Sequence, residues 1–549
     1  MQMNCLAAAA LAALAGSAFG QSAIKGPSSS QTPYLVPSPT VTGVDTISIL
    51  TVGDTIGGYR LVGIPDGMGA LRNAANPGTF DLFVNHELNF TQGVVRAHGQ
   101  TGAFISRWNI NTDPSNLAVN AGRDHNTSFA DAFEWNGAAW TNAAGIAQRW
   151  GRWCSADLAA PSAYKFGTLG TDARIYLNGE EVGPEGRNYA HIVTGPAANQ
   201  SWRLPRLGRF SVENQLASPF PQLKTVVMGL DDATPGQLYV YIGTKTAAGN
   251  DVERAGLTNG SLYGVRVAGL ALETRASGAS GRFDLFNLGN VENTTGAVVQ
   301  TNSVAAGVTE FLRPEDGHWD PRTGRQNDFY FVTTDRYNTA ATPGNSRLYR
   351  LRFDDITDPT LGGKITMLVD GFTSGPQMMD NMCIDPMGRV LIQEDIGNQA
   401  ALGKIWVYNI ENGKLREIAR HDPARFSAPV PPFSQDEESS GIIDMFDILG
   451  KGWYTLNVQA HYPIAGELVE GGQLLAMRVD LNIACPGDFN NDTFTDDADF
   501  VIFAAAYNSL LCPGGTVITS CPWDINGDGE VSDPDFVLFA QGYNDLLCQ

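Results

Sequence analysis

The sequence predicts a mainly β protein: a six-bladed β-propeller followed by a small all-α module built on calcium-binding loops. The 549 residues include 61 Gly and 29 Pro, a composition that favours a turn-rich β fold over a helical one. Six short apolar runs recur at spacings of roughly 60 to 90 residues, as expected of blades that carry insertions. The third signal is a duplicated C-terminal segment with two acidic loops, each followed by a helical pattern.

Each of the six apolar runs ends in, or lies beside, acidic, amide or imidazole side chains. The runs cover residues 83–87, 175–181, 238–245, 329–335, 390–395 and 453–461. A carboxylate at the end of a buried strand is costly unless another charge or a metal ion meets it. We therefore expect the polar strand ends to converge on one central point of a closed radial fold.

The N-terminal segment is typical of an export signal. Residues 6–19 form an Ala/Leu-rich stretch, and Ala18-Phe19-Gly20 before Gln21 provides a small-residue cleavage site. A transmembrane anchor is the alternative, although about 14 apolar residues is short for a span. We expect the mature chain to be secreted and to lack a membrane span. The predicted segments are a signal peptide over 1–20, a flexible lead-in over 21–45, the propeller over 46–482 and the C-terminal module over 483–549.

The chain is strongly acidic, with a formal net charge of −22. Nucleic acid is an unfavourable partner because its phosphates would be repelled. Residues 485–549 hold ten Asp, one Glu and no Lys or Arg, so half of the net charge lies in this tail. An acidic exported chain commonly collects divalent cations, and solubility alone is the other explanation.

The tail is an internal duplication with an offset of 36 residues. Each copy begins with side-chain oxygens at loop positions 1, 3, 5, 9 and 12, the spacing that wraps a short loop around one calcium ion. Gly529 supplies the sharp turn at position 6 of the second loop, whereas Thr493 stands there in the first, so the first site should bind more weakly. The predicted ligands are Asp488, Asn490, Asp492, Asp496 and Asp499 in the first loop, and Asp524, Asn526, Asp528, Ser532 and Asp535 in the second.

A helix is predicted after each loop, with Phe500, Phe503 and Tyr507 on one face of the first. Two loop–helix repeats with Asp at loop position 12 resemble a type I dockerin. The resemblance implies calcium-dependent docking to a cohesin-like protein, and many dockerins are attached to polysaccharide-degrading enzymes. A calcium-stapled pair of helices that only attaches or spaces the body is the alternative.

The cysteines divide between the tail and the body. Two Cys bracket the loop and helix of each tail copy, so within-copy disulfides are the simplest pairing, and the other two connectivities stay open. The simplest pairs are Cys485 with Cys512 and Cys521 with Cys548. Cys154 and Cys383, both in the body, are expected to be free and buried.

A second set of acidic motifs lies in turns next to the apolar runs, at residues 64–67, 229–232, 313–317, 380–381 and 437–441. Two of these motifs are followed by an Asp-Pro turn, at Asp320-Pro321 and Asp385-Pro386, and then by a strand. An acidic turn, an Asp-Pro turn and a strand therefore occur twice, as expected of repeated blades.

With residues 85–87, 180–181, 313–316, 380–381, 438–441 and 457–461 in this order and spacing, the chain resembles the PhoX-type alkaline phosphatases over roughly residues 55–480. These are secreted six-bladed propellers. The resemblance implies a phosphomonoesterase whose acidic motif residues hold a calcium- and iron-containing cluster. One position departs from the family, because the iron-binding Cys before the double Glu is Gly179 here. We therefore expect several Ca²⁺ ions, with no iron thiolate at that place and the iron in doubt.

Clusters of carboxylate and amide oxygens suit hard cations. The preferred propeller ligands are Glu87, Glu180, Glu181, Glu315, Asp316, Glu394 and Glu438, followed by Asp231, Asp232, Asp380, Asn381 and Asp395. Glu181 is also a candidate catalytic residue, with His86 and His461 as proton donors to a leaving oxygen or as ligands of a transition metal. Arg313 and Arg187 are candidates to bind phosphate through their planar guanidinium groups, and Arg313 is also a candidate catalytic residue. A capping or ion-pair role is the alternative for each.

The favoured function is a secreted, metal-dependent phosphatase acting on phosphorylated small molecules at a multi-metal site. The first alternative is a non-catalytic calcium-binding propeller that binds a ligand or partner. The second is another propeller hydrolase, lactonase-like or phytase-like, or one linked to polysaccharide breakdown through the dockerin-like tail. The sequence shows no Gly-rich phosphate loop and no nucleophile elbow.

Overall fold

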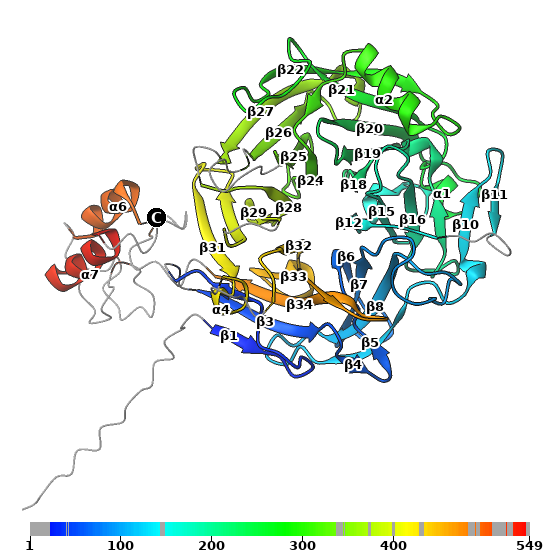
Figure 1. Cartoon of the computed structure of the whole chain (residues 1–549). Coiled ribbons are helices and arrows are strands. Elements are labelled where there is room, and N and C mark those ends of the chain that lie inside the picture. Colours follow the sequence, from blue (N-terminus) through cyan, green and yellow to red (C-terminus); the bar gives the residue numbers. More distant parts are fainter. Residues whose placement is uncertain are drawn as a thin grey trace, which may run out of the picture.

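The computed structural model describes residues 22–39, 41, 43–142, 149–335, 344, 346–371, 375–397, 401–427, 433–480, 489, 495–507, 523 and 531–544. The described chain is mainly β, and its sheets are arranged like propeller blades around a common centre (Figure 1). The segment predicted to be a signal peptide lies outside the described residues. Among the described residues, no helix has both the length and the apolar character needed to cross a membrane.

Six inner strands line the centre of the propeller. Each is the innermost strand of one group of antiparallel strands, which we call a blade. Neighbouring inner strands contact one another in a closed circle, from blade I to blade VI and back to blade I. These strands are β6 (Pro65–Arg72), β12 (Trp153–Asp157), β18 (Val212–Ala217), β24 (Pro314–Trp319), β28 (Met379–Ile384) and β32 (Glu437–Asp444).

The outer strands of the first four blades follow their inner strands along the chain, except that β10 and β11 of blade II precede theirs. Blade I adds β7 (Thr79–His86), β8 (Phe104–Asn111) and β9 (Val119–Asp124). Blade II adds β15 (Ile175–Glu180), β16 (Asn188–Ile192), β17 (Ser201–Arg203), β10 (Ala132–Trp135) and β11 (Trp140–Asn142). Blade III adds β19 (Lys224–Asp231), β20 (Gly236–Thr244), β21 (Ser261–Val267) and β22 (Gly281–Gly289). Blade IV adds β25 (Asp328–Thr333), β26 (Arg347–Phe353) and β27 (Gly363–Asp370), and β27 pairs with β22 to join blades III and IV.

The last two blades are completed by the N-terminal segment. Blade V contains β29 (Arg389–Glu394), β30 (Lys404–Asn409) and β31 (Leu415–His421), with β2 (Leu35–Pro37) at its outer edge. Blade VI contains β33 (Trp453–Ile464), β34 (Val469–Val479), β3 (Val44–Thr51) and β1 (Ser22–Lys25).

This closure differs from the sequence-based expectation of a flexible lead-in over residues 21–45. The structure places β1 and β2 of that segment in sheets, where β2 pairs antiparallel with β31 and β1 pairs parallel with β3. The added strands satisfy main-chain groups that would otherwise stand at exposed sheet edges. The N-terminal segment is therefore part of the propeller.

The hydrophobic core is divided among the six interfaces between neighbouring blades, each filled by one cluster of buried side chains. The second strands, such as β25 and β29, are buried along their whole length because a blade packs on each of their faces. This explains why continuous apolar runs, rather than alternating ones, marked these strands in the sequence. The packing also fixes how the inner strands face the centre.

The propeller also contains short helices and small hairpins outside its main sheets. The hairpins are β4 (Thr55–Ile56) with β5 (Tyr59–Arg60) and β13 (Lys165–Phe166) with β14 (Leu169–Gly170), and β23 (Glu310–Phe311) pairs with β20. Among the described residues of the body, the α-helices with defined bounds are α1 (Asp251–Arg254), α2 (Gly296–Ala305), α4 (Pro423–Phe426) and α5 (Phe446–Leu449). The 3₁₀ turns are η1 (Phe129–Asp131), η2 (Pro161–Ala163), η3 (Pro205–Leu207) and η4 (Pro359–Leu361).

The C-terminal tail contains the two helices that the sequence predicts, α6 (Asp497–Tyr507) and α7 (Asp533–Asn544). Phe503 of α6 stacks on Phe539 of α7, with ring centroids 5.0 Å apart. The duplicated apolar positions therefore pack the two helices against each other. Whether the tail is a dockerin stays a prediction.

Candidate metal centre

The same irregularity occurs in every inner strand, near its start in the first five and in the middle of β32. In each, two consecutive residues lie opposite one residue of the second strand, which is the geometry of a β-bulge. The first bulge residues are Asp66, Cys154, Glu213, Glu315, Asp380 and Gly441, in order from blade I to blade VI. We call these six positions the ring. A bulge redirects a side chain out of the regular alternation, so six equivalent bulges place six equivalent residues around one centre.

Ring residues and their neighbours form three overlapping groups that could hold metal ions. In each group the candidate ligand atoms lie within 4.8 Å of one another. The groups share Cys154 and Glu213, so they form a continuous arc rather than isolated sites. The groups are Asp66 with Glu87 and Cys154, Cys154 with Glu181 and Glu213, and Glu213 with Glu315 and Asp380.

The donors fit metal binding because several of their buried oxygens accept no hydrogen bond, although Glu315 Oε1 is ion-paired with Arg313. Among the described residues, Asp66 Oδ1 and both carboxylate oxygens of Glu315 are buried without a hydrogen bond. Buried polar atoms are normally hydrogen-bonded, and a buried carboxylate is especially costly when it is not. Oxygen-rich sets with one thiol suit hard cations together with a thiophilic metal. The arrangement is therefore that of a multi-metal site.

The electrostatics of the ring point the same way. Burial, together with the neighbouring acids, raises the pKa of Asp66, Glu213 and Asp380 well above the usual carboxyl range. Burial and the Asp66 carboxylate raise the pKa of the Cys154 thiol as well. Without cations the cluster would have to take up protons, whereas divalent ions would keep its groups ionised.

Two arginines reach over the ring from equivalent positions. Arg152 and Arg313 each stand two residues before a ring residue, in blades II and IV, with left-handed φ values of +43° and +46°. Ile64 and Met378 hold the corresponding positions in blades I and V with φ values of +52° and +49°. Such backbone costs of order 1 kcal/mol per non-Gly residue and tends to persist at functional sites. It turns the chain sharply into each bulge.

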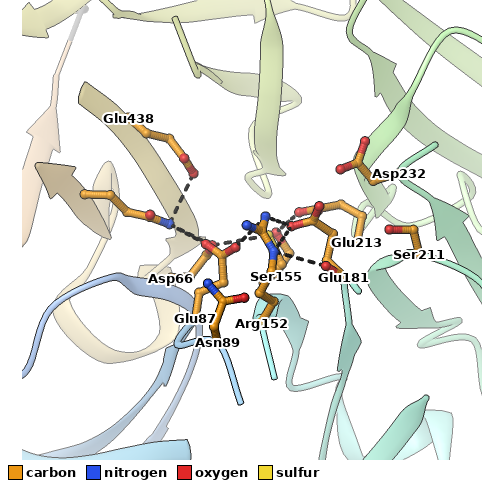
Figure 2. A network of polar contacts seen from close by, with 12 residues as sticks. Asp66, Glu87, Asn89, Arg152, Ser155, Glu181, Ser211, Glu213, Asp232 and Glu438 are labelled. Atoms are coloured by element: carbon orange, nitrogen blue, oxygen red, sulfur yellow. Dashed lines mark hydrogen bonds and ion pairs between the residues drawn. The ribbon is translucent and has the colours of Figure 1, made fainter. Parts of the chain in front are cut away.

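Each of the two arginines connects acids of the cluster. Arg152 contacts Glu181 and approaches Glu87 Oε1 to 2.7 Å (Figure 2). Arg313 donates to Asp232 Oδ1 at 2.7 Å and lies 2.8 Å from Glu315 Oε1. These contacts outweigh burial and raise the pKa of Arg313 above its usual range, while Arg313 holds the pKa of Asp232 below its usual range. Both guanidinium groups therefore stay charged beside the ring.

Blade VI contributes differently, because its ring residue is Gly441. A Cβ at this position would lie 2.5 Å from the main-chain oxygen of Asp66. Glu438 lies three residues earlier, and Gln459 Nε2 connects it to the ring by hydrogen bonds to Glu438 at 3.3 Å and Asp66 at 2.9 Å. His461 bonds Glu470 at 2.7 Å and faces Glu438 at 3.8 Å. These carboxylates outweigh burial and raise the pKa of His461 well above 6.5, so it carries charge.

Buried amides of the second strands hold the bulges from the neighbouring blade. Asn85 in β7 donates to the carbonyl of Cys154 at 2.7 Å. Gln393 in β29 donates to the carbonyl of Ser440 at 3.3 Å and accepts from the amide of Ile442 at 3.0 Å. Asn457 in β33 donates to the carbonyl of Asp66. Each amide therefore couples one blade to the bulge of the next.

The structure shows where the acidic motifs of the sequence lie. Residues 64–67, 313–317, 380–381 and 437–441, expected in turns, start inner strands instead. The polar ends of the second strands supply fewer central groups than expected. Of the predicted propeller ligands, the three metal-binding groups include Glu87, Glu181, Glu315 and Asp380, while Asp232 and Glu438 lie beside them.

Several other predicted ligands are not members of these groups. Glu394 accepts hydrogen bonds from Trp406 Nε1 at 2.8 Å and from two main-chain amides, and burial raises its pKa to about 8. Asp316 points the opposite way from Glu315 and accepts from Asn214 at 2.7 Å. Asp231 accepts from the Ser211 amide at 3.1 Å, and Asn381 donates to Asp380. The main chain of Asp395 bridges to Glu438.

Glu180 and Arg187 form an ion pair with each other. Arg187 Nη2 donates to Glu180 Oε1 at 2.6 Å, and Arg187 also lies 3.7 Å from Glu134. His86 is buried in blade I, where it contacts Ser106 Oγ at 2.8 Å and stacks on Phe104. Burial lowers the pKa of His86 to about 3, so its imidazole is neutral. These contacts lie outside the three groups.

The structure adds a sulfur atom that the sequence-based list of site residues did not include. Cys383 and Cys154 are free and buried, as predicted, but Cys154 belongs to two of the three metal-binding groups. A thiol is therefore present at the centre, although residue 179 is glycine. A Cβ at Gly179 would lie 2.2 Å from Val212 Cγ1, so this position faces the packing with blade III and not the ring.

Cys154, Glu213, Asp66 and Arg152 were missing from the sequence-based list of site residues. Asp66 lies in a recognised motif but precedes Gly67 in what resembled an ordinary turn. Glu213 and Cys154 have neither an acidic pair nor a turn motif around them. The signal that connects all four is the repeated bulge, which depends on strand pairing and leaves no fixed spacing in the sequence.

In the tail, four of the ten predicted calcium ligands are described. Asp499 accepts from the amides of Phe489 at 2.8 Å and Asp496 at 3.0 Å, and Asp535 accepts from the amide of Ser532 at 2.9 Å. The last acid of each loop therefore caps its helix. The remaining loop ligands, Asp488, Asn490, Asp492, Asp524, Asn526 and Asp528, lie outside the described residues, as do Cys485, Cys512, Cys521 and Cys548.

Comparison with known proteins gives the family and agrees with the fold. The family model described as "Alkaline phosphatase PhoX" matches residues 63–431. No curated protein matches the sequence. Among solved structures, the chain is similar to Pseudomonas fluorescens PhoX in complex with vanadate, a transition-state analogue, with 13% identity and a TM-score of 0.51 over 84% of this chain and 98% of that one.

Other solved structures are more distant. The catalytic domain of Coprinopsis cinerea GH62 α-L-arabinofuranosidase shares 8% identity with a TM-score of 0.33, covering 80% of this chain and 98% of that one. A PL25 ulvan lyase shares 11% identity with a TM-score of 0.31, covering 77% of this chain and 80% of that one.

Proposed function

Because the chain belongs to the PhoX family of alkaline phosphatases, and is therefore a phosphatase, we propose that it hydrolyses phosphate monoesters at the ring. The observation that carries the proposal is the combination of three overlapping metal-binding groups with two charged arginines directly beside them. An anionic phosphate ester binds to positively charged groups, and the buried acids also need positive charge beside them. A metal-loaded ring flanked by arginines suits a dianionic phosphate ester.

Asp66, Glu87, Cys154, Glu181, Glu213, Glu315 and Asp380 would hold the metal ions. Bound metal ions would neutralise phosphate charge and provide an activated oxygen nucleophile. The carboxylates suit Ca²⁺, while the Cys154 thiol adds a softer donor that suits a metal such as iron. We propose several Ca²⁺ ions together with one transition metal near Cys154.

Arg152 and Arg313 would bind the phosphate oxygens. The planar guanidinium group donates two parallel hydrogen bonds, and each arginine already lies 2.7–2.8 Å from carboxylate oxygens of the cluster. Glu181, shared between Arg152 and the second metal-binding group, would align the two. His461 holds a proton next to Glu438 and would balance the negative charge on that side of the ring.

We propose further that the protein acts outside the cell and that its tail is a calcium-dependent docking module. The PhoX family is typically secreted, and the duplicated helices α6 and α7 pack as a separate pair around Phe503 and Phe539. A cohesin-like partner and the loop disulfides are part of this proposal. The propeller function does not depend on it.

The test combines elemental analysis of the purified protein with a phosphatase assay on a simple aryl phosphate at alkaline pH. Metal in the protein and chelator-sensitive release of phosphate are expected. Glu315→Gln should abolish turnover, whereas Glu394→Gln, a buried acid engaged with Trp406 instead, should retain it. Equal activity of Glu315→Gln and the wild type would disprove the assigned site.

A further inference from the structure

A cavity of about 210 Å³ adjoins the ring on the side of blade III. Its walls come from the loop after β15, the start of β18, the β19–β20 loop and helix α2. Asp232 lines the cavity and also binds Arg313, so the cavity and the candidate phosphate site share a wall. The cavity is therefore a direct neighbour of the acidic centre.

The cavity lies on the side where the arginine position is occupied by a small residue. Ser211 stands two residues before the ring residue of blade III, the place that Arg152 and Arg313 hold in blades II and IV. Ser211 lies beside Asp232 (Figure 2) and lines the cavity with it, and the Ser211 carbonyl accepts from the Asp232 amide at 2.8 Å. A phosphate held by Arg313 would therefore lie next to Asp232, and its ester substituent would point past Ser211 towards the cavity.

Much of the remaining lining is apolar, and its one arginine is ion-paired. Pro184, Phe210, Ala233 and Tyr239 form much of the wall. Arg209 at the cavity is paired with Glu185 at 2.9 Å, and the acids Asp231 and Asp232 would repel a second anionic group. The lining therefore selects an uncharged, apolar substituent rather than another phosphate or a carboxylate.

The volume limits the size of that substituent. An apolar cavity of about 150 Å³ holds one benzene molecule. A cavity of about 210 Å³ therefore accepts one six-membered ring with a small substituent, but not two fused rings. Gly296 closes one end, because a Cβ there would lie 1.4 Å from the main-chain oxygen of Pro184, which brings α2 directly onto this loop.

We propose that this cavity is the leaving-group subsite of the phosphatase and that it receives the single apolar ring of a phosphate monoester such as an aryl phosphate. This inference rests on the proposed function of the ring. It makes the substituent next to Ser211 the part of the substrate that the enzyme discriminates.

The test compares kcat/KM of the metal-loaded full chain for phenyl phosphate, 1-naphthyl phosphate and glycerol 2-phosphate. The wild type should prefer phenyl phosphate over the other two by about ten-fold or more, as expected from burial of one ring. Ala233→Phe fills the cavity and should reduce turnover of phenyl phosphate to the level of glycerol 2-phosphate, leaving glycerol 2-phosphate unchanged. Ala198→Phe, at a half-buried turn of blade II outside the cavity, is the control.

Ala233→Leu, a smaller filling, keeps the test valid if Ala233→Phe does not fold, and it should give an intermediate loss. Unchanged selectivity in a folded Ala233 variant, or an equal loss for all three esters, would overturn the subsite. If the wild type hydrolyses none of the esters, the proposed function fails instead. Calorimetry then decides the subsite separately: phenylphosphonate must bind more tightly than methylphosphonate, and Ala233→Leu must remove the difference.

Discussion

The side-chain amide of Asn85 donates a 2.7 Å hydrogen bond to the main-chain carbonyl of Cys154, which belongs to the next blade. Both residues are buried, and Asn85 Oδ1 is itself held by Tyr176 at 3.0 Å and Asn178 at 3.1 Å. The amide therefore fixes the bulge that presents the thiol. Groups that orient a metal ligand typically affect metal affinity or activity by about 10- to 100-fold.

Asn85→Asp should lower metal content and phosphatase activity by about 10-fold or more. The substitution is nearly isosteric, but it replaces the Nδ2 donor by an oxygen that faces the Cys154 carbonyl. Metal content is measured by elemental analysis and activity by kcat/KM, alongside the melting temperature.

Asn188→Asp is the matched control. Asn188 is buried in blade II, donates to the Gly208 carbonyl at 2.9 Å and accepts from Gln215 at 2.6 Å, but it contacts no bulge. Both variants should lose similar stability, and only Asn85→Asp should lose metal. Equal metal content in the two variants would contradict the positioning role.

Cys154→Ser should remove the transition metal and reduce activity by at least about 100-fold, because a serine hydroxyl does not replace a thiolate for a thiophilic ion. Cys383→Ser provides the comparison, since Cys383 is equally buried and lies outside the three metal-binding groups. Elemental analysis of the two variants distinguishes the roles. If both retain the full metal complement, Cys154 is not a ligand.

Arg313→Lys should lower kcat/KM by about 100-fold, because lysine keeps the charge but loses the two-pronged contact that now joins Asp232 and Glu315. The comparison variant is Arg187→Lys, whose arginine pairs with Glu180 outside the metal-binding groups. It should keep kcat/KM within a few-fold while lowering the melting temperature. The reverse ranking in steady-state kinetics would assign phosphate binding to Arg187.

His86→Gln should flatten the acid dependence of stability. Burial lowers the pKa of His86 from 6.5 to about 3 in the folded protein, so between these values only the unfolded chain takes up the proton. Stability is therefore lost as pH falls below about 6.5, by about 1.4 kcal/mol per pH unit for this one group. Denaturant unfolding at pH 6.5, 5.5 and 4.5 should show a slope shallower by that amount in the variant.

Ser106→Ala removes the hydrogen bond to His86 Nε2 but keeps the imidazole, so its slope should match the wild type. Parallel curves for His86→Gln and the wild type would show that His86 does not titrate in this way. Full phosphatase activity of His86→Gln is also expected, because the residue lies in the core of blade I.

Local sequence patterns were sufficient to predict the propeller architecture and part of the candidate metal centre. Continuous apolar runs marked strands buried between two blades, such as β25 and β29, because burial on both faces removes the usual alternation. Glu87, Glu181, Glu315 and Asp380 stood out because acids next to such strands need a compensating charge.

The identity of the remaining central residues was settled by packing across the ring. Asp66, Cys154 and Glu213 reach the centre because a bulge in each inner strand turns one residue out of the regular alternation. The choice between Glu181 and Glu180 has the same origin: adjacent residues on a strand point to opposite sides, and one meets Arg152 while the other meets Arg187.

Composition, apolar runs and acidic motifs thus predicted a β-propeller with a metal-binding centre, because such patterns depend only on the burial and charge of each segment. Which side chains meet at the centre depends on strand register, bulges and the amides of neighbouring blades, and these exist only when residues such as Asn85 and Cys154 are brought together across 69 positions of the chain. Contacts of that range leave no local pattern, so the folded chain alone defines them.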